Sequence, residues 1–416
     1  MLKKPELLLP AGTLDKLKIA INYGADAVYA GLADMSLRAK SSFPAQDLAE
    51  GIEYARAREK KVYLTLNFFS KNEDEAKLKS FLNHIETLSP DGLIISDPGV
   101  FAYVKNALPR IPLHISTQAN ICSYLTVNFW KNMGASLCVL GREVSFSEAL
   151  EIRQKCPDIR LEMFVQGAMC VSYSGRCLMS AFMASRPANK GACANSCRWK
   201  YKSKLIMEEE LRPGEYLELF EDARGSYILN SKDLCLMPRL DKVLEANFDS
   251  LKIEGRTKSE YYTAQTARVY RKAIDDYFAN PPAWKPDVYM QELAKLQNRG
   301  FTLGFFEGSP DADAFNYEST LSEGDYHTTG IVTGSDSETL TLKVKNFFAT
   351  GDELEFLSPF QFESVKVKIS AIYDAKTNES LSRASVGKTN YSVKISADKE
   401  TLKLLPKYTL SRKKSK

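Results

Sequence analysis

Four of the eight cysteines in the chain lie within one short segment, CVSYSGRCLMSAFMASRPANKGACANSC, spaced C-x6-C-x15-C-x3-C. Four thiolates can hold either a 4Fe-4S cluster or a structural zinc ion. Zinc sites usually pair cysteines roughly two to four residues apart, so the gap of six residues favours iron–sulfur. A segment this rich in Gly, Ser and Asn disfavours the other interpretation, in which all four are buried apolar side chains. The candidate ligands are Cys170, Cys177, Cys193 and Cys197.

A fifth thiol, Cys235 in NSKDLCLM, follows a predicted strand end and could replace Cys197 as a ligand. Arg176 and Arg198 flank the cysteines and would offset the negative charge of a tetrathiolate cluster. The remaining cysteines stand singly in predicted strands or helices, where a small buried side chain is expected. They are Cys122, Cys138 and Cys156.

The elements that position these residues follow a repeated pattern. Up to about residue 260, short apolar runs alternate with longer segments whose apolar residues recur at helical spacing. About eight such units predict a (β/α)₈ barrel, and the first helix lacks the Gly-rich fingerprint of a doubly wound sheet. We place this domain at residues 1–319. The runs are ELLLPAG, DAVYAG, KVYLTLN, DGLIISDPG, LHISTQAN, LCVLGREV, LEMFVQG, YILNSKD and SLKIEGR.

Several of these runs end in polar residues, where a barrel of this kind has its active site. Each residue taken alone also fits a turn or a helix cap. The residues are Asn67, Asp97, Thr117, Gln118, Arg142, Glu143, Gln166, Lys252 and Glu254.

A second domain is predicted at residues 320–416, after the helical stretch YYTAQTARVYRKAIDDYF and the proline-rich NPPAWKPD. Short alternating strands joined by Gly, Asp and Asn turns indicate a small antiparallel β-barrel. The sequence of this domain resembles that of the second-domain barrel of elongation-factor-Tu-like translation proteins. The basic end, SRKKSK, is expected to be a disordered tail, with a phosphate-contacting arm as the alternative.

The composition, 44% hydrophobic and 26% charged, is that of a soluble globular protein, and no apolar run could span a membrane. No export signal is recognisable, so we expect a cytoplasmic protein whose thiols stay reduced and serve a metal or catalysis. The formal net charge of +4 is too small to predict nucleic-acid binding by itself.

The segment EMFVQGAMC, then four residues, then GRCLMS, fits the pattern E-x-F-x-x-G-[SA]-[LIVM]-C-x4-G-x-C-x-[LIVM]-S. The chain thereby resembles peptidase family U32, the collagenase-like proteases. The resemblance extends to PELLLPAG, GADAVYAG, HISTQAN, NSKDL, SLKIEGRTKS and the C-terminal barrel, and so covers nearly the whole chain.

Several bacterial members of this family are implicated in oxygen-independent hydroxylation with a 4Fe-4S cluster on four cysteines. The chain looks like the branch that converts the wobble uridine of tRNA to 5-hydroxyuridine, a reaction in which prephenate is implicated. The resemblance implies ligands at Cys170, Cys177, Cys193 and Cys197, while other branches use a cysteine at the position of Cys235. A histidine is common just before the first glycine of the motif. Gln166 stands there in this chain, so no role of that histidine is carried over.

The hydroxylase hypothesis also needs an anion site and an RNA surface. Arg142, Lys252, Glu254 and Arg256 lie near predicted strand ends and could hold a dicarboxylate such as prephenate. An inter-strand ion-pair network explains the same four residues equally well. The small barrel and the basic tail would contact tRNA phosphates while an anticodon base reaches the cluster unstacked.

Two other hypotheses remain. A peptidase finds little support, because the chain has no HExxH helix and no G-x-S-x-G elbow. A Cys–His nucleophile would need His114, since the other histidines are His84 and His327. A hydrogen-bonded strand residue is the better interpretation of His114. The second hypothesis, a non-catalytic RNA-binding scaffold, does not explain why four cysteines are grouped in one segment. No residue stands out as a general base.

Overall fold

The protein was analysed as a computed structural model. It describes residues 2–31, 43–169, 196, 231–308, 322, 324–386 and 392–415, and only the backbone of short strands between residues 207 and 227. Those short strands form two pairs, β8 (Met207–Glu208) with β9 (Tyr216–Leu217) and β10 (Phe220–Asp222) with β11 (Gly225–Tyr227).

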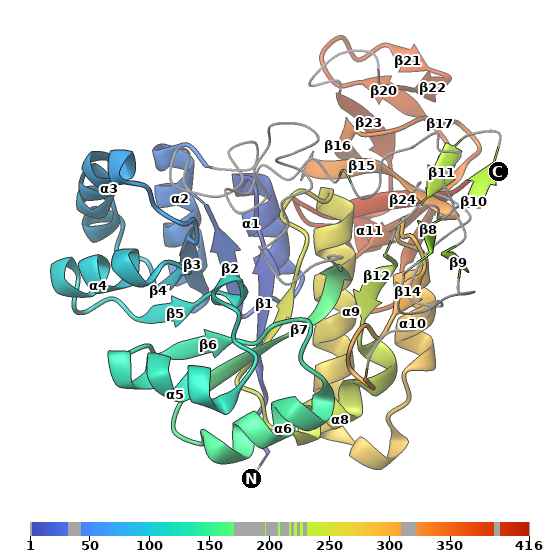
Figure 1. Ribbon diagram of the computed structural model, residues 1–416. Coiled ribbons are helices and arrows are strands. Elements are labelled where there is room, and N and C mark those ends of the chain that lie inside the picture. Colours follow the sequence, from blue (N-terminus) through green and yellow to red (C-terminus); the bar gives the residue numbers. More distant parts are fainter. Residues whose placement is uncertain are drawn as a thin grey trace.

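Within the described residues, eight parallel strands close into a barrel, as the sequence predicts (Figure 1). The ring closes because β13 pairs with both β1 and β7. The strands are β1 (Glu6–Pro10), β2 (Ala27–Ala30), β3 (Lys61–Leu66), β4 (Gly92–Ile95), β5 (Leu113–Ile115), β6 (Leu137–Val139), β7 (Arg160–Ala168) and β13 (Ser250–Ile253).

Helices surround this ring. They are α1 (Leu14–Asn22), α2 (Ala45–Arg56), α3 (Glu75–Leu88), α4 (Pro98–Ala107), α5 (Tyr124–Met133), α6 (Phe146–Lys155), α8 (Leu240–Glu245), α9 (Glu260–Ala279) and α10 (Asp287–Ala294). Polar caps fix where several begin: the side chains of Thr13, Ser145 and Ser259 accept backbone N–H groups in the first turn of α1, α6 and α9.

The described end of one predicted barrel run, YILNSKD, lies outside the ring. It leads into β12 (Asp233–Cys235), which pairs antiparallel with the last residues of β7, and β14 (Phe301–Thr302) pairs with β12. The long strand β7 has room for β12 because β6 pairs with it only as far as Glu162, whereas β12 pairs with Gln166 to Ala168. The barrel therefore closes through β13, and β12 extends the sheet outside the ring.

Side chains alternate along each strand between the barrel interior and the helices. Leu7 and Leu9 pack outward into the large apolar core under the helices, while Leu8 points inward. The inward cluster comprises Leu8, Ala27, Tyr29, Tyr63 and Ile94. Apolar burial on both faces of the strands therefore stabilises the ring, with aromatic rings filling its centre.

The C-terminal domain is a curled antiparallel sheet with strand order β19-β18-β24-β15-β16-β23-β20-β21, which confirms the predicted small all-β domain. Its own core includes Val332, Leu342 and Phe356. Its elements are β15 (Tyr326–Ser335), β16 (Thr339–Val344), β17 (Phe348–Ala349), β18 (Glu353–Leu357), β19 (Val365–Lys368), β20 (Ile372–Asp374), β21 (Ser380–Leu381), β22 (Arg383–Ala384), β23 (Ser392–Ser396), α11 (Lys399–Leu404) and β24 (Leu410–Lys414).

The two domains share one apolar core across α1 and α9 (Figure 1). Ile331, Leu357 and Leu410 of the C-terminal domain belong to the same buried cluster as the barrel helices. The hydroxyl of Tyr23 on α1 donates to the carbonyl of Leu357 (2.5 Å) and accepts the N–H of Leu410 (3.1 Å). The C-terminal domain is therefore packed onto the barrel as part of one folded body.

The basic end of the chain corrects a prediction. SRKKSK was expected to be disordered, yet β24 is an interior strand between β18 and β15. Arg412 is fully buried there and binds Glu355 and Glu292. Lys413 pairs with Asp352. Because carboxylates from other elements satisfy these charges, Arg412 and Lys413 do not form a phosphate-binding arm.

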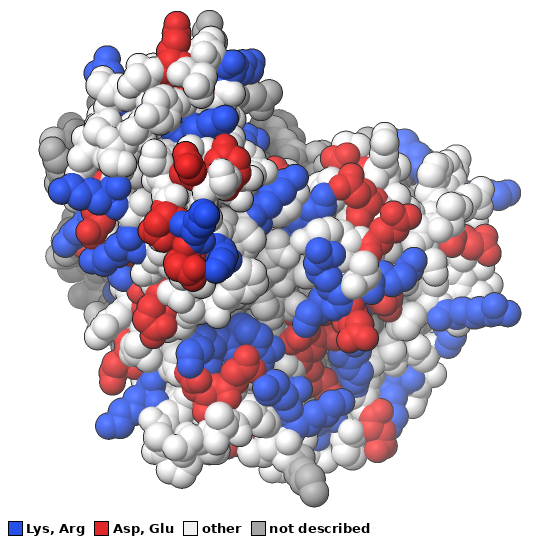
Figure 2. All heavy atoms as spheres, turned by 180° about the vertical axis from the view of Figure 1, so that it is seen from behind, with Lys and Arg blue, Asp and Glu red and all other residues white. Residues whose placement is uncertain are grey.

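Charge on the outer surface is mixed. On the face in Figure 2, Lys and Arg side chains alternate with Asp and Glu, and the described residues form no expanse of one sign. This distribution agrees with the small formal net charge of +4. Among the described residues, no helix is both long and apolar enough to cross a membrane.

Candidate active site at the barrel mouth

The structure brings together the four residues predicted near strand ends. Arg142 follows β6, while Lys252, Glu254 and Arg256 lie in and just after β13. The Arg142 guanidinium lies 3.7 Å from the Glu254 carboxylate and 3.9 Å above the centre of the Phe164 ring. These contacts place a cation and a carboxylate at the C-terminal ends of β6 and β13, the two strands that flank β7, where barrels of this kind carry their active sites.

Lys252 is held by a buried carboxylate of the next strand. Its Nζ donates to Glu162 Oε1 (2.8 Å), and Ser250 donates to the other oxygen of Glu162 (2.8 Å). The side chains of Lys252 and Glu162 are only 6% and 1% exposed, so this pair is shielded from solvent. Lys252 therefore belongs to the ion-pair network offered as the alternative interpretation, and an anion bound there would have to share it with Glu162.

Glu254 and Arg256 are fixed by hydroxyl groups from strands across the barrel. Tyr29 donates to Glu254 Oε2 (3.0 Å), and Arg256 donates to Thr65 Oγ1 (2.9 Å). Arg256 is almost fully buried. A planar guanidinium has five N–H donors in a fixed geometry that matches a carboxylate. The mouth thus contains two arginines in fixed positions.

A buried amide oxygen points to a ligand at the same mouth. Asn67 follows β3 two residues after Thr65, so strand alternation directs both side chains to the barrel interior. Asn67 Oδ1 is buried and has no hydrogen-bond partner in the described structure. Buried polar atoms are almost always paired, so an unpaired acceptor at a barrel mouth marks a candidate substrate contact.

Close backbone approach requires glycine at this mouth. Gly167 near the end of β7 has φ of +128°, and a Cβ there would lie 2.5 Å from the carbonyl oxygen of Glu254. A side chain would therefore push β13 and Glu254 away from β7. This glycine is part of the sequence motif that precedes Cys170, and the close approach of β13 explains why the motif has glycine at this position.

Other polar residues at run ends have local roles. Asp97 caps α4 by accepting the N–H of Val100 (3.0 Å), and Gln118 accepts the hydroxyl of Ser96 (3.0 Å). The side chain of Gln166 points out of the barrel interior, because the pairing of β7 with β13 is irregular at this point. Its amide oxygen accepts the Tyr270 hydroxyl of α9 (3.0 Å).

The remaining run-end residues, Thr117 and Glu143, are also engaged. Thr117 donates to the carbonyl of Leu140 (3.3 Å), and Glu143 accepts from Asn120 (3.4 Å) and from Cys122 (3.6 Å). Glu143 contributes to raising the pKa of the Cys122 thiol to about 12, after the larger effect of burial. These local contacts agree with the alternative interpretation of Thr117 and Glu143, that they are turn residues.

The four predicted cluster ligands and the two flanking arginines lie outside the described residues. They are Cys170, Cys177, Cys193, Cys197, Arg176 and Arg198. Met169, the last described residue before Cys170, is buried at the end of β7. Within the described part of the chain, no group of three or more His, Cys, Asp or Glu side chains could hold a metal. The predicted ligand set therefore stays a prediction.

Cys235 is described, and its surroundings are those of a core thiol. Its sulfur lies 3.9 Å from the Tyr270 hydroxyl and 3.8 Å from the Met290 sulfur, between β12 and the helices α9 and α10. Burial raises the pKa of this thiol to about 11. A metal ligand must be a thiolate, so as it stands Cys235 is poorly prepared for ligation. Its alternative role also stays a prediction.

His114, the histidine that a peptidase dyad would need, is buried within the barrel. Its ring packs edge-on against Tyr63, with 4.6 Å between the ring centres. Burial lowers its pKa to about 3, and the positive charges of Arg160, Lys252 and Lys61 lower it further. A histidine with this pKa does not take a proton at neutral pH, so it is unsuited to activate a thiol.

The match to known families is extensive. Residues 12–316 match peptidase family U32, and residues 324–405 match the peptidase family U32 C-terminal domain. The chain belongs to peptidase family U32.

Individual relatives carry two kinds of name. The "tRNA hydroxylation protein P" of Escherichia coli (strain K12) is 41% identical over 397 residues, covering 86% of each chain. The "tRNA hydroxylation protein P1" of Bacillus subtilis (strain 168) is 38% identical over 381 residues, covering 91% of this chain and 89% of the relative. The "Collagenase" of Porphyromonas gingivalis (strain ATCC BAA-308 / W83) is 31% identical over 317 residues, covering 73% of each chain.

Proposed function

We propose that this protein acts in tRNA hydroxylation, converting the wobble uridine to 5-hydroxyuridine with a 4Fe-4S cluster on Cys170, Cys177, Cys193 and Cys197. The barrel mouth carries the proposal, because arginines and a buried unpaired amide oxygen lie there beside the strand that leads to the cysteines. Similarity along most of the chain to proteins named for tRNA hydroxylation supports it. Cys235 is kept as an alternative ligand.

The proposed reaction replaces the C5–H bond of uracil by a C5–OH bond and removes two electrons, so it needs a co-reactant that supplies the oxygen atom and an acceptor for both electrons, neither of which is a side chain of this protein. When bound, a 4Fe-4S cluster supplies one-electron redox chemistry. Thiol donors fit such a cluster, and the mouth adds arginine cations that offset its negative charge. The residues of the chain then have the tasks of binding the base, binding the co-substrate and excluding water.

Arg142 and Arg256 are the groups that we assign to a dicarboxylate such as prephenate. Glu254 holds Arg142 from one side, and Thr65 holds Arg256. We assign Lys252 no direct contact with this anion, because Glu162 already pairs with it. To Asn67 Oδ1 we assign the N3–H of an unstacked uracil, since an amide oxygen can accept a hydrogen bond from that edge of the base.

The peptidase alternative has one observation in its favour, the similarity to a protein named collagenase. The buried, neutral His114 speaks against a Cys–His nucleophile. Cleavage of casein by the purified protein, abolished by a cysteine reagent, would support the peptidase over the hydroxylase.

The test is mass spectrometry of nucleosides in total tRNA from a deletion strain that carries each variant on a plasmid. We expect 5-hydroxyuridine derivatives to be restored by the wild type and by Cys122→Ala, and to stay absent with Cys177→Ala. Cys122 is a matched control because it is a single thiol outside the cysteine segment. Anaerobically purified wild type should absorb broadly near about 400 nm, and Cys177→Ala should not. Unchanged nucleosides in the deletion strain would refute the proposal.

A further inference from the structure

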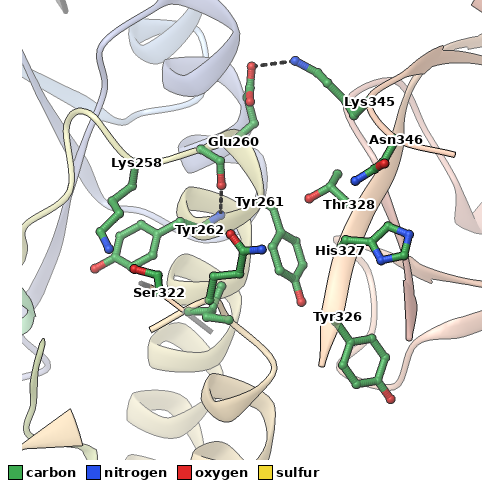
Figure 3. A pocket seen from close by; sticks show the side chains of 13 residues that line it. Lys258, Glu260, Tyr261, Tyr262, Ser322, Tyr326, His327, Thr328, Lys345 and Asn346 are labelled. Atoms are coloured by element: carbon green, nitrogen blue, oxygen red, sulfur yellow. Dashed lines mark hydrogen bonds and ion pairs between the residues drawn. The ribbon is translucent and has the colours of Figure 1, made fainter. Parts of the chain in front are cut away.

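A cavity of about 350 Å³ lies between the two domains, outside the barrel ring (Figure 3). One wall is the first turn of α9, and the other is the start of β15 with the turn after β16. The volume is at the lower end of the range of about 300 to 1,000 Å³ typical of small-ligand sites. It would suit one ribose-phosphate unit. The lining residues used below are Lys258, Glu260, Tyr262, Thr328, Lys345 and Asn346.

Positive charge gathers at this cavity. Lys345 from the C-terminal domain pairs with Glu260 on α9 at 3.0 Å, across the top of the cavity in Figure 3. Lys16 approaches from α1 and donates to the backbone carbonyl of Lys258 (2.6 Å). Burial lowers the pKa of Lys16, and Lys345 lowers it further against the opposite effect of Glu260. Lys345 and Lys16 thus lie near the partly buried carboxylate of Glu260, while the Lys258 ammonium pairs with Asp233 (3.6 Å).

The cavity also offers hydrogen-bonding groups. Thr328 contributes a hydroxyl and Asn346 an amide, and Asn346 is exposed. The next residue in the sequence, Phe347, exposes 46% of its surface, which is unusual for a large apolar side chain. A lysine that can pair with a phosphate, together with hydroxyl and amide groups, suits a contact to the backbone of a single-stranded nucleic acid.

The cavity lies next to the barrel mouth through a direct contact. Tyr262 lines the cavity, and its hydroxyl donates to the backbone carbonyl of Glu254 (2.8 Å), the residue that holds Arg142. Only residues 255–257, in the turn after β13, separate Glu254 at the barrel mouth from Lys258 at the cavity. A strand of RNA whose base enters the barrel would therefore pass close to the cavity.

We propose that this interdomain cavity binds a phosphate and its adjoining ribose in the RNA strand next to the base that enters the barrel. The inference rests on the proposed function and adds a second contact for the same substrate. Lys345 binds the phosphate, and Glu260 competes with the phosphate for it. The shared core of the two domains holds both walls of the cavity at a fixed separation.

The test measures binding of an unmodified anticodon stem-loop RNA to the purified full-length protein by fluorescence anisotropy at several salt concentrations. We expect Lys345→Ala to weaken binding about three- to tenfold and to reduce the salt slope by about 0.7, the value for one phosphate contact on a single strand. Lys345→Arg should bind within about twofold of the wild type, because it retains the charge. Glu260→Gln should tighten binding about two- to fivefold, since it removes the competing carboxylate.

The matched control is Lys394→Ala. Lys394 is also an ion-paired lysine of the C-terminal domain, 33% exposed against 28% for Lys345, but its partner Asp336 lies beyond the far end of β15. It should bind RNA as the wild type does.

The opposite signs separate a ligand site from a structural ion pair. If the pair only joined the domains, Lys345→Ala and Glu260→Gln would change binding in the same direction, and that result would overturn the inference. Equal RNA binding by the wild type and Lys345→Ala would also overturn it. The proposed function would survive either result if the wild type still restored 5-hydroxyuridine in cells. Failure of that restoration would instead refute the function.

Discussion

Replacing Arg412 by Met tests whether a buried cation joins the two domains. The guanidinium donates to Glu355 (2.8 Å), to Glu292 (3.2 Å) and to the Tyr261 hydroxyl (3.3 Å), and the residue is fully buried. Methionine fills much of the same space but carries no charge. The variant therefore leaves two carboxylates without their shared counter-ion.

The two carboxylates left without their counter-ion determine the expected loss of stability. Removing one partner of a buried ion pair costs roughly 3 to 5 kcal/mol. Glu292 keeps Arg268 and Lys295 as neighbours, so we expect the lower end, about 3 kcal/mol at pH 7.

The loss should depend on pH. Burial alone would raise the pKa of Glu292, but Arg412, then Lys295 and Arg268, lower it from 4.5 to about 2. A carboxyl group with a depressed pKa stabilises the fold above its unfolded value, and that contribution disappears as the pH falls towards the folded value. Since the variant lacks the main cause of the depression, the difference between the two proteins should shrink between about pH 4.5 and pH 2.

The assay is urea unfolding followed by circular dichroism at pH 7, 5 and 3. Urea is preferred because guanidinium salt would screen the interactions under test. Arg383→Met serves as the control, because Arg383 is an exposed arginine of the same domain, and it should change stability by less than about 0.5 kcal/mol. A loss below about 1 kcal/mol for Arg412→Met at pH 7, or an equal loss at pH 3 and pH 7, would refute the reasoning.

Three further predictions concern the barrel. Glu162→Gln leaves Lys252 without its carboxylate, so the free energy of unfolding in urea should fall by about 3 kcal/mol, and an unchanged midpoint would contradict the buried pair. Gly167→Ala puts a Cβ 2.5 Å from the carbonyl of Glu254, so we expect lost tRNA hydroxylation in complemented cells while circular dichroism remains native. His114→Gln should leave hydroxylation intact because His114 is neutral, and loss of a casein-cleaving activity in this variant would instead support the dyad.

The barrel could be predicted because its strands repeat a simple pattern, but β12 shows where that pattern is insufficient. A short apolar run reports a buried strand without its direction. Asp233–Cys235 is buried as a barrel strand would be, yet it runs antiparallel to β7. The same irregular pairing turns Gln166 outward to Tyr270, although its position at a run end predicted the mouth. Strand direction and bulges depend on partners far away in the sequence.

The basic tail was mispredicted for a related reason. Composition makes SRKKSK look like a solvated end, but the carboxylates that neutralise Arg412 are 57 and 120 residues away. Burial of a cation depends on such distant partners, which local composition does not contain. Asn67 was found at a run end, whereas only the structure shows that its amide oxygen has no partner. The cysteine motif is recognisable from its spacing in the sequence alone, while the metal that this spacing predicts stays a prediction.

The barrel mouth and the interdomain cavity lie close together, and this explains why the C-terminal domain should be held rigidly against the barrel. A hydroxylating enzyme must hold one base at its reactive centre, and a flipped base is positioned partly by the phosphates beside it. Here Tyr262 links the cavity wall to Glu254 at the mouth, while Lys345 reaches the same cavity from the other domain. If the domains moved independently, the distance from Lys345 to the barrel mouth would vary. The shared apolar core and the buried Arg412 remove that freedom, so the proposed phosphate site and the proposed base site are held at a separation that the fold fixes.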